Sequence, residues 1–133
     1  MIIITPHNHI TKYFKLKEVM CPCCCELIMD SLFYRHMKLL DVVREELGCQ
    51  ITINSGHRCI KHNREVGGAK CSMHLKFATD IRPSDGGKDK LDYLRDIVPS
   101  YFTGVGQYWS FVHVDLRENP YTWDNRNERA IKR

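Results

Sequence analysis

Long apolar runs and processing signals are missing from this sequence. No stretch of about 18 or more apolar residues occurs, so no helix of the chain is expected to span a bilayer. The N-terminal stretch MIIITPHNHITKYFK has no basic start, no long apolar segment and no small-residue cleavage site, and therefore does not look like a signal peptide. We expect the protein to be cytoplasmic as it is synthesised.

Internal repeats, low-complexity stretches and linkers are also missing. The 133 residues are therefore expected to form one domain around a single core, with flexible ends at residues 1–12 and 124–133. Gly67 and Gly68 do not indicate a phosphate-binding loop, because no Gly-Lys-Ser/Thr follows them and no strand–helix–strand pattern surrounds them. We interpret the two glycines as a turn.

Charge of one sign is only slightly in excess. The chain has 20 Lys and Arg against 16 Asp and Glu, which gives a net charge of +4, and the basic residues are scattered. Nucleic-acid-binding domains gather their basic residues on one face, so we interpret these charges as a solvated surface and do not expect nucleic acid as a partner. A monomer is expected.

The seven cysteines do not fit a framework of disulfides. Their number is odd, no secretion signal is visible, and four of them fall within residues 21–25. Cys21 and Cys24 have the Cys-x2-Cys spacing of a zinc-ligand pair, and folding would let Cys59 or Cys71 complete a structural site. Inert thiols remain the alternative, because no second Cys-x2-Cys pair exists and thiols are common in protein cores.

Hydrophobic periodicity and turn residues predict helices mixed with short strands. Asp30 is placed to cap a helix that runs to Leu47 and ends at Gly48, with apolar residues at helical spacing. The order shows no regular strand–helix–strand repeat, which favours the α+β class with a small antiparallel sheet. The remaining expected elements are strands at 50–55 and 77–83, a short helix within 56–70, a helix within 84–100, two strands within 101–117, and a polar tail that begins with a turn.

The segment SFVHVDLR, residues 110–117, is the strongest chemical signal in the chain. Side chains alternate along a strand, so Phe111, His113 and Asp115 share one face, while Val112, Val114 and Leu116 form a core-like face. A histidine and a carboxylate side by side are uncommon on a purely structural strand, although a solvated polar face is the alternative interpretation. The pattern indicates a candidate site.

A second segment, SMHLKFATDIRP at residues 72–83, supplies the rest of a metal-ligand set. His74, Asp80 and His113 are two imidazoles and a carboxylate, the open three-ligand set of a catalytic zinc. Zinc acidifies a bound water until it is a hydroxide-like nucleophile near neutral pH. A base must take the proton, and Asp115, on the same strand face as His113, is the carboxylate that we predict for this role.

These motifs resemble a known family. SGHRCIKHNREVGGAKCSMHLKFATDIRP is similar to the central region of the zinc D-Ala-D-Ala carboxypeptidase-like peptidases, with its Ser-Gly-aromatic-Arg turn, Val-Gly-Gly and Ser-x-His. GVGQYWSFVHVDLRENPYTW resembles their Gly-x-Gly strand, Phe-Val-His-x-Asp-x-Arg and following Trp. FKLKEVMCPCCCE is similar to the lead-in of one branch, so the resemblance extends from about Tyr13 to Trp123.

The resemblance implies a hedgehog/DD-peptidase fold and a zinc peptidase of D,D-carboxypeptidase or endopeptidase type. Its substrates would be peptidoglycan stem peptides or cross-links with D-amino acids, as in single-domain phage lysins that reach the cell wall during lysis. His74, Asp80 and His113 fall on the metal-ligand positions. Arg58 falls on the arginine that binds a substrate carboxylate or the oxyanion, and Ser72 on a serine beside the first ligand, which either supports that ligand or contacts the substrate.

Three positions depart from the family pattern. The step from His74 to Asp80 is one residue shorter than usual and contains no glycine. Ser110 stands where some relatives carry an acidic base, which is why the base role passes to Asp115 here. His57 replaces the usual tyrosine of the Ser-Gly-aromatic-Arg turn.

Two further functions remain open from the sequence. The shortened ligand step and the missing acid at Ser110 suit a module that keeps the fold and the metal but only binds peptidoglycan. The CPCCC cluster and the net charge of +4 suit, with less support, a cysteine–metal module that binds nucleic acid. We rank the peptidase first.

Overall fold

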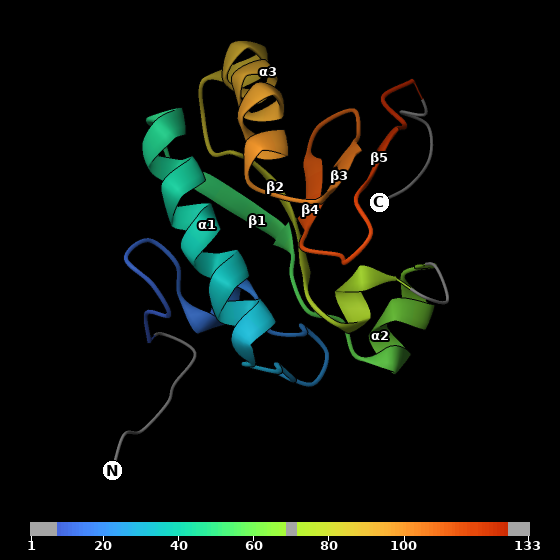
Figure 1. Cartoon of the computed structure of the whole chain (residues 1–133). Coiled ribbons are helices and arrows are strands. Elements are labelled where there is room, and N and C mark those ends of the chain that lie inside the picture. Colours follow the sequence, from blue (N-terminus) through green and yellow to red (C-terminus); the bar gives the residue numbers. More distant parts are fainter. Residues whose placement is uncertain (1–7, 69–71, 128–133) are drawn as a thin grey trace.

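A five-stranded sheet with its two longer helices packed on one face forms the structure, a computed structural model that describes residues 8–68 and 72–127 (Figure 1). The strands lie in the order β1-β2-β4-β3-β5, and all neighbours are antiparallel except β3 and β5. The predicted α+β class is confirmed. The elements are η1 (Leu16–Glu18), α1 (Ser31–Leu47), β1 (Ile51–Ser55), α2 (Ile60–Glu65), η2 (Met73–Leu75), β2 (Ala78–Pro83), α3 (Gly87–Ile97), η3 (Val98–Ser100), β3 (Gly104–Gln107), β4 (Val112–Asp115) and β5 (Tyr121–Asp124).

Helix α1 begins and ends where its sequence predicts. The Asp30 side chain accepts a hydrogen bond from the Phe33 N–H at 3.0 Å, and Gly48 adopts the left-handed conformation (φ 80°) that ends the helix. Its apolar stripe packs into the core together with α3. Neither α1 nor any other described helix is long and apolar enough to cross a membrane. The buried residues of α1 are Phe33, His36, Met37, Leu40, Val43 and Leu47.

The two faces of the sheet carry different kinds of side chain. Antiparallel pairing sets Asp80 opposite His113 and Thr79 opposite Val114, so alternate residues of β2 and β4 point to opposite sides. On the core face, Ile81 and Val114 are fully buried near α1 and α3. Asp80 and His113 therefore share the other face, away from these helices.

The C-terminal segment differs from the sequence-based expectation. The sequence predicts a turn followed by a polar tail, but residues 121–124 form β5, which pairs in parallel with β3. Strand β5 is only four residues long and largely exposed, so its pairing depends on the neighbouring strand β3.

Parts of the expected flexible ends make contacts. The Thr11 hydroxyl donates to Asp41 at 2.9 Å, and Asp124 is the last residue of β5. The remaining residues of these two ends, 1–7 and 128–133, lie outside the described part of the chain.

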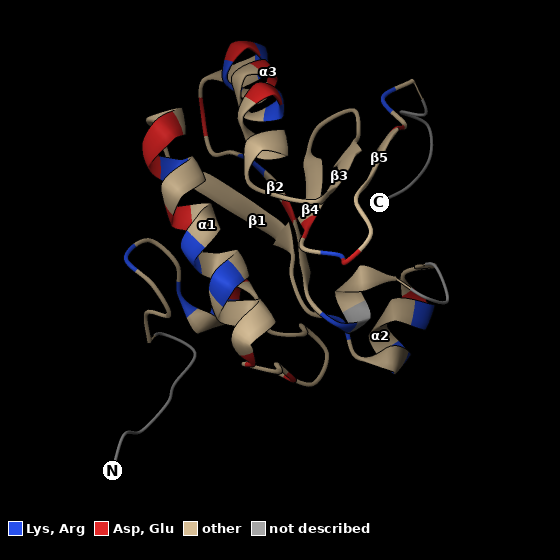
Figure 2. Ribbon diagram, in the orientation of Figure 1, with Lys and Arg blue, Asp and Glu red and all other residues tan. Residues whose placement is uncertain are grey.

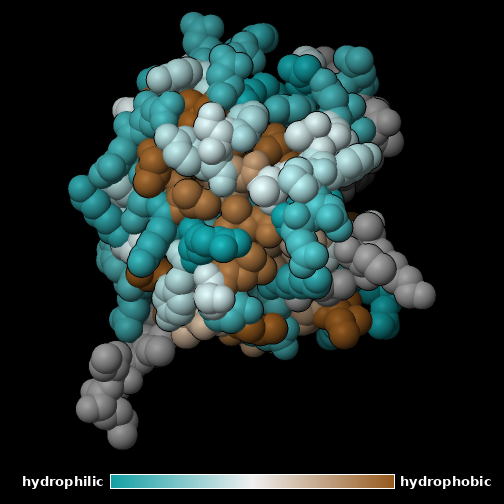
Figure 3. All heavy atoms as spheres, viewed as in Figure 1, coloured by the Kyte–Doolittle hydropathy of each residue, from teal (hydrophilic) through white to brown (hydrophobic). Residues whose placement is uncertain are grey.

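Charged residues are dispersed over the ribbon, and hydrophilic residues surround a group of hydrophobic residues in the middle of the face seen in the space-filling view (Figures 2 and 3). Lys and Arg are mixed with Asp and Glu along α1 and α3 and do not form one block on the side shown. This distribution agrees with the interpretation of the net charge as a solvated surface.

A buried histidine joins the core to the sheet. His36 of α1 is completely buried, its Nε2 lies 2.9 Å from the Thr79 hydroxyl, and its ring contacts those of Phe77 and Phe102. Burial disfavours the charged imidazolium and lowers the pKa of His36 to about 3. The residue therefore serves packing.

We predict that His36 makes the metal-free protein less stable in mild acid. Its folded pKa lies below the unfolded value of about 6.5, so the unfolded chain takes up the proton first and stability falls as the pH falls, by about 1.4 kcal/mol per pH unit between about pH 6 and 4.5. In His36→Phe this dependence should be flatter. Urea unfolding of both proteins with a chelator at several pH values measures it, and equal slopes would contradict the prediction.

Candidate metal centre

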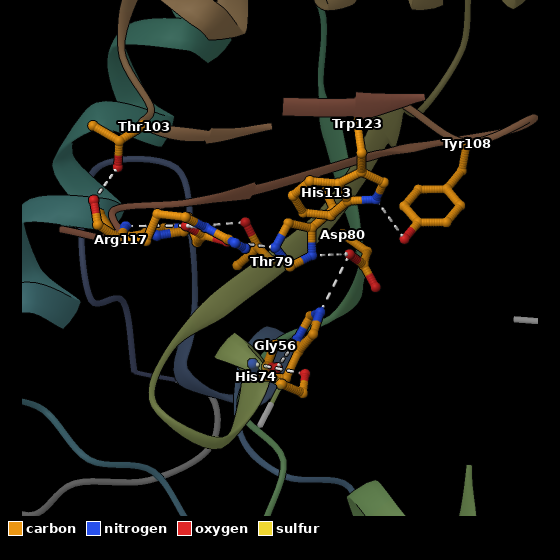
Figure 4. Close-up of polar contacts among 12 residues, drawn as sticks. Gly56, His74, Thr79, Asp80, Thr103, Tyr108, His113, Arg117 and Trp123 are labelled. Atoms are coloured by element: carbon orange, nitrogen blue, oxygen red, sulfur yellow. Dashed lines mark hydrogen bonds and ion pairs between the residues drawn. The ribbon is translucent and has the colours of Figure 1, made fainter. Parts of the chain in front are cut away.

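Three residues predicted as metal ligands meet on the open face of the sheet. His74 comes from η2, Asp80 from β2 and His113 from β4, and all three are buried. Asp80 Oδ1 lies 3.3 Å from His74 Nε2 and 3.0 Å from His113 Nδ1, and the two rings point toward this carboxylate from different sides (Figure 4). The shorter step from His74 to Asp80 thus still lets the two side chains meet.

The outer nitrogen of each ring is held by a hydrogen-bond acceptor. His74 Nδ1 lies 2.7 Å from the Gly56 carbonyl oxygen and His113 Nε2 lies 2.6 Å from Asp115 Oδ2, so both of these nitrogens donate. In the neutral rings the lone pairs are then on His74 Nε2 and His113 Nδ1, which face Asp80. Carboxylates and carbonyls fix metal-binding histidines in this manner in known metal sites.

The separations of the three ligand atoms suit one ion. They all lie within 4.8 Å of one another. Zinc bonds of about 2.0–2.1 Å in a tetrahedral site place neighbouring N and O ligands about 3.3 Å apart, close to the contacts between Asp80 and the two rings. The described residues therefore fit a mononuclear zinc site with three protein ligands, and a fourth position would be open toward the cavity.

Asp115 is an anchor of His113 and does not line the cavity. Its side chain is completely buried, and it also accepts hydrogen bonds from the backbone N–H and the guanidinium of Arg117, with Arg117 Nη2 at 2.6 Å. Burial by itself would raise the pKa of the Asp115 carboxyl, but the hydrogen bonds from Arg117 and His113 outweigh it and hold this pKa well below its usual range.

This environment argues against the predicted general-base role of Asp115. The carboxylate lies on the far side of the His113 ring from Asp80, and a strongly lowered pKa makes it a poor proton acceptor. The alternation of the strand predicts correctly that Asp115 and His113 are neighbours on one face. It does not reveal that the carboxylate is saturated by Arg117, because that contact depends on the chain beyond the strand.

Asp80 keeps its negative charge in this centre. Burial favours the neutral acid, but without a metal the rings of His113 and His74 donate to Asp80 when they are protonated, and these hydrogen bonds and charges outweigh burial, so the pKa of Asp80 lies well below its ordinary value. The carboxylates of Asp115 and Asp80 overcome the effect of burial on His113 and raise its pKa. An anionic Asp80 between two imidazoles is the charge arrangement that a divalent cation requires.

Two glycines of β3 make room for the neighbours of His113. A Cβ on Gly104 would lie 2.0 Å from Asp115 Oδ1, and a Cβ on Gly106 would lie 2.3 Å from the Trp123 ring. Gly106 pairs with both His113 and Trp123, whose ring centroids are 5.1 Å apart. The Gly-Val-Gly motif thus allows the Asp115 anchor and the Trp123 wall to approach the strand.

Arg58 and Ser72 lie at the mouth of the same centre. Arg58 Nη1 donates to Asn63 Oδ1 at 3.1 Å, and Nη2 lies 3.9 Å from Asp80 Oδ2. Gly68 permits this arrangement, because a Cβ there would lie 2.8 Å from Arg58 Nη1. Ser72 caps η2 by accepting a hydrogen bond from the His74 N–H at 3.1 Å, so it positions the first ligand.

His57, which replaces the usual tyrosine, is buried and does not line the cavity. Its Nε2 lies 2.8 Å from Glu26 Oε2 and its Nδ1 lies 3.2 Å from the Lys76 carbonyl oxygen. The ring therefore joins the segment after the cysteine cluster to the loop that follows His74.

A cavity of about 530 Å³ opens above the three ligands. Asp80 is its one carboxylate among the described residues that line it, and the Trp123 N–H donates to the Tyr108 hydroxyl at 2.9 Å across its wall. Sequence reasoning missed Tyr108 and Tyr121, which have no motif of their own, and Arg117, which the family pattern contains. The lining residues are Arg58, Gly68, Ser72, Met73, His74, Asp80, Tyr108, Phe111, His113, Arg117, Tyr121, Trp123 and Asn125.

Two imidazoles and a carboxylate below an open cavity are typical of zinc-dependent hydrolases. A family comparison identifies the class further: the model of the peptidase M15 family matches residues 12–115. The chain therefore belongs to the peptidase M15 family of metallopeptidases, and its fold is the hedgehog/DD-peptidase fold of that family. None of the curated proteins compared with the chain matches it significantly.

We predict that Asp115→Asn weakens zinc binding more than catalysis. The amide removes the negative charge behind His113, so zinc affinity should fall by about 10- to 100-fold, as for other partners of metal-binding histidines. At saturating zinc, turnover should stay within a few-fold of the wild type. Competition with a chromophoric chelator and peptidase assays over a zinc series measure the two effects.

Asp124→Asn is the matched control for this experiment. Asp124 also pairs with the arginine two residues later, Arg126, but it is exposed and does not line the cavity. It should change neither zinc affinity nor turnover. A collapse of turnover in Asp115→Asn at full zinc occupancy with unchanged affinity would restore Asp115 as the base.

Proposed function

We propose that this protein is a zinc-dependent peptidase that hydrolyses peptidoglycan stem peptides or cross-links at bonds involving D-amino acids. The observation that carries the proposal is the fixed orientation of the two histidine rings in the candidate metal centre. Both histidine rings are fixed by Gly56 O and Asp115 so that their lone pairs face Asp80 at the base of a cavity. Membership of the peptidase M15 family supports peptide-bond hydrolysis.

A zinc ion held by these three ligands would supply Lewis acidity and lower the pKa of a bound water. Arg58 supports the reaction from the side, because its guanidinium is held by Asn63 Oδ1 and lies 3.9 Å from Asp80 Oδ2. From there it is placed to bind the oxyanion that develops on the scissile carbonyl, or a substrate carboxylate.

The walls of the cavity favour an extended peptide with an anionic group. Arg58 and Arg117 contribute positive charge, and the rings of Tyr108, Phe111 and Trp123 contribute flat apolar surface. The Tyr108 and Phe111 rings are stacked, with centroids 4.7 Å apart, which stiffens this wall. A stem peptide has a carboxylate and small apolar side chains that match these surfaces. The substrate lies outside the cytoplasmic membrane, so the proposal requires that the protein reaches the wall, as a lysis enzyme does.

A catalytically inactive, peptidoglycan-binding module is the second candidate. The observation that favours it is the lack of a second carboxylate among the described residues that line the cavity. Without such a base, proton removal from the attacking water depends on the acidity that the metal confers and on solvent. Such a protein would bind the wall without releasing peptides from it.

The first experiment is a mass-spectrometric digest of purified cross-linked muropeptides with and without a chelator. We expect new fragments that disappear with the chelator and return with zinc, and their masses identify the bond. His113→Ala should produce none, because it removes a metal ligand. A folded, zinc-loaded wild type that sediments with insoluble peptidoglycan but releases no fragments would contradict the peptidase and favour the binding module.

We also predict a specific role for the Arg58 guanidinium. Arg58→Lys keeps the positive charge but loses the planar fork, so kcat/KM should fall by about 100-fold while the zinc content is unchanged. Arg64→Lys is the matched control, because Arg64 is an exposed residue of α2, the helix that begins just after Arg58. Steady-state kinetics together with metal analysis test this. A wild-type kcat/KM in Arg58→Lys would remove Arg58 from the chemistry.

A further inference from the structure

Four cysteines gather at a second place, which belongs neither to the cavity nor to the His–Asp–His centre. Cys21, Cys23 and Cys24 come from the loop after η1, and Cys59 comes from the residue before α2. Their four Sγ atoms all lie within 4.8 Å of one another. Cys71, the other candidate from the sequence, lies outside the described residues.

The sulfur separations fit thiolates around a shared ion better than they fit disulfides. Cys23 Sγ lies 3.5 Å from Cys21 Sγ and 3.3 Å from Cys59 Sγ, and all four cysteines are free. A disulfide needs a sulfur–sulfur distance of about 2.05 Å. In a tetrahedral site with zinc–sulfur bonds of about 2.3 Å, neighbouring sulfurs are about 3.8 Å apart. A modest expansion of the cluster would therefore admit the ion.

Backbone groups already surround these sulfurs in the manner of thiolate ligands. The Cys59 N–H donates to Cys21 Sγ at 3.4 Å, and the His62 N–H donates to Cys59 Sγ at 3.3 Å. The loop itself is closed by a hydrogen bond from the Cys25 N–H to the Cys21 carbonyl oxygen at 2.8 Å. These contacts fix two of the sulfurs and turn the chain so that Cys23 and Cys24 reach the same point.

We propose that Cys21, Cys23, Cys24 and Cys59 hold a structural zinc ion. Four thiolates in a tetrahedral set are the ligands of closed zinc sites, which stabilise a fold and leave no position for a substrate. Two of these thiols, Cys23 and Cys24, are exposed, so they need the metal and not the core to hold them in place. The assignment does not depend on the peptidase function, because no ligand is shared with the His–Asp–His centre.

The zinc site would tie two segments that support the other centre. The His57 N–H donates to the Val19 carbonyl oxygen at 2.8 Å, so the segment before Cys21 lies beside the segment before Cys59. Gly56 makes this contact possible, because a Cβ there would lie 2.5 Å from Val19 O. Gly56 also accepts the hydrogen bond from His74 Nδ1, and Arg58 directly precedes Cys59. The ion would therefore join the two segments close to Gly56 and Arg58.

Metal analysis and cobalt substitution of the full chain test the proposal. Protein purified under reducing conditions should contain two equivalents of zinc per chain by elemental mass spectrometry. Replacement by Co²⁺ should give the intense near-ultraviolet thiolate-to-cobalt charge-transfer absorption of a tetrathiolate site. His113→Ala should lose one equivalent of metal and keep this absorption, which separates the two centres.

The matched cysteine variants identify the ligands. Cys24→Ser should halve the zinc-to-protein ratio, remove the cobalt–thiolate absorption and expose the remaining cluster thiols to alkylation. Cys25→Ser, in the same loop but outside the cluster, and Cys49→Ser should leave all three readouts unchanged. The cobalt spectrum of the wild type needs no variant, so the test survives if Cys24→Ser fails to fold.

Three results would overturn the proposal. The first is a wild type whose metal is all lost in His113→Ala and whose cobalt form lacks thiolate absorption. The second is a cluster disulfide, seen as a mass lower by two hydrogens and as resistance to alkylation that a reductant removes. The third is loss of metal in Cys25→Ser but not in Cys24→Ser, which would remove Cys24 from the ligand set.

Discussion

The antiparallel pairing of β2 with β4 is the constraint on which the rest of the site depends. It sets Asp80 directly opposite His113, so a carboxylate and an imidazole lie side by side on one face of the sheet. The same register places Ile81 and Val112 on the other face, in the core. A slip by one residue would turn the ligands into the core and the core residues into the cavity. Burial of the apolar face thus fixes the geometry of the candidate metal centre.

Around this pair, the chain supplies a layer of groups that orient the ligands. Gly56 O and the Asp115 carboxylate decide which nitrogen of each ring carries its proton, and Ser72 caps the turn that carries His74. Arg117 in turn holds Asp115 through its backbone N–H and its guanidinium. Each of these contacts acts through a ligand, which explains why Asp115 is better placed as an anchor than as a base.

Much of this arrangement is predictable from local sequence. The cap at Asp30, the stop at Gly48 and the strand alternation around His113 are properties of short segments, and each is found where it was expected. The ligand set follows from residue type, because imidazole and carboxylate are the groups that zinc prefers. Strand β5 and the wall residue Tyr121 were missed, since the segment 121–124 is exposed and gains its pairing from β3.

The sequence by itself determined the helices, the inner strands and the chemical identity of the candidate ligands, since these depend on propensity, periodicity and residue type. Only the tertiary structure decided which groups meet. It paired Asp115 with Arg117 and His113, placed His57 between Glu26 and Lys76, and brought Cys59 to the Cys21–Cys24 loop. These contacts join residues on different elements, and their distances are set by the packing of the whole domain, which no local pattern encodes.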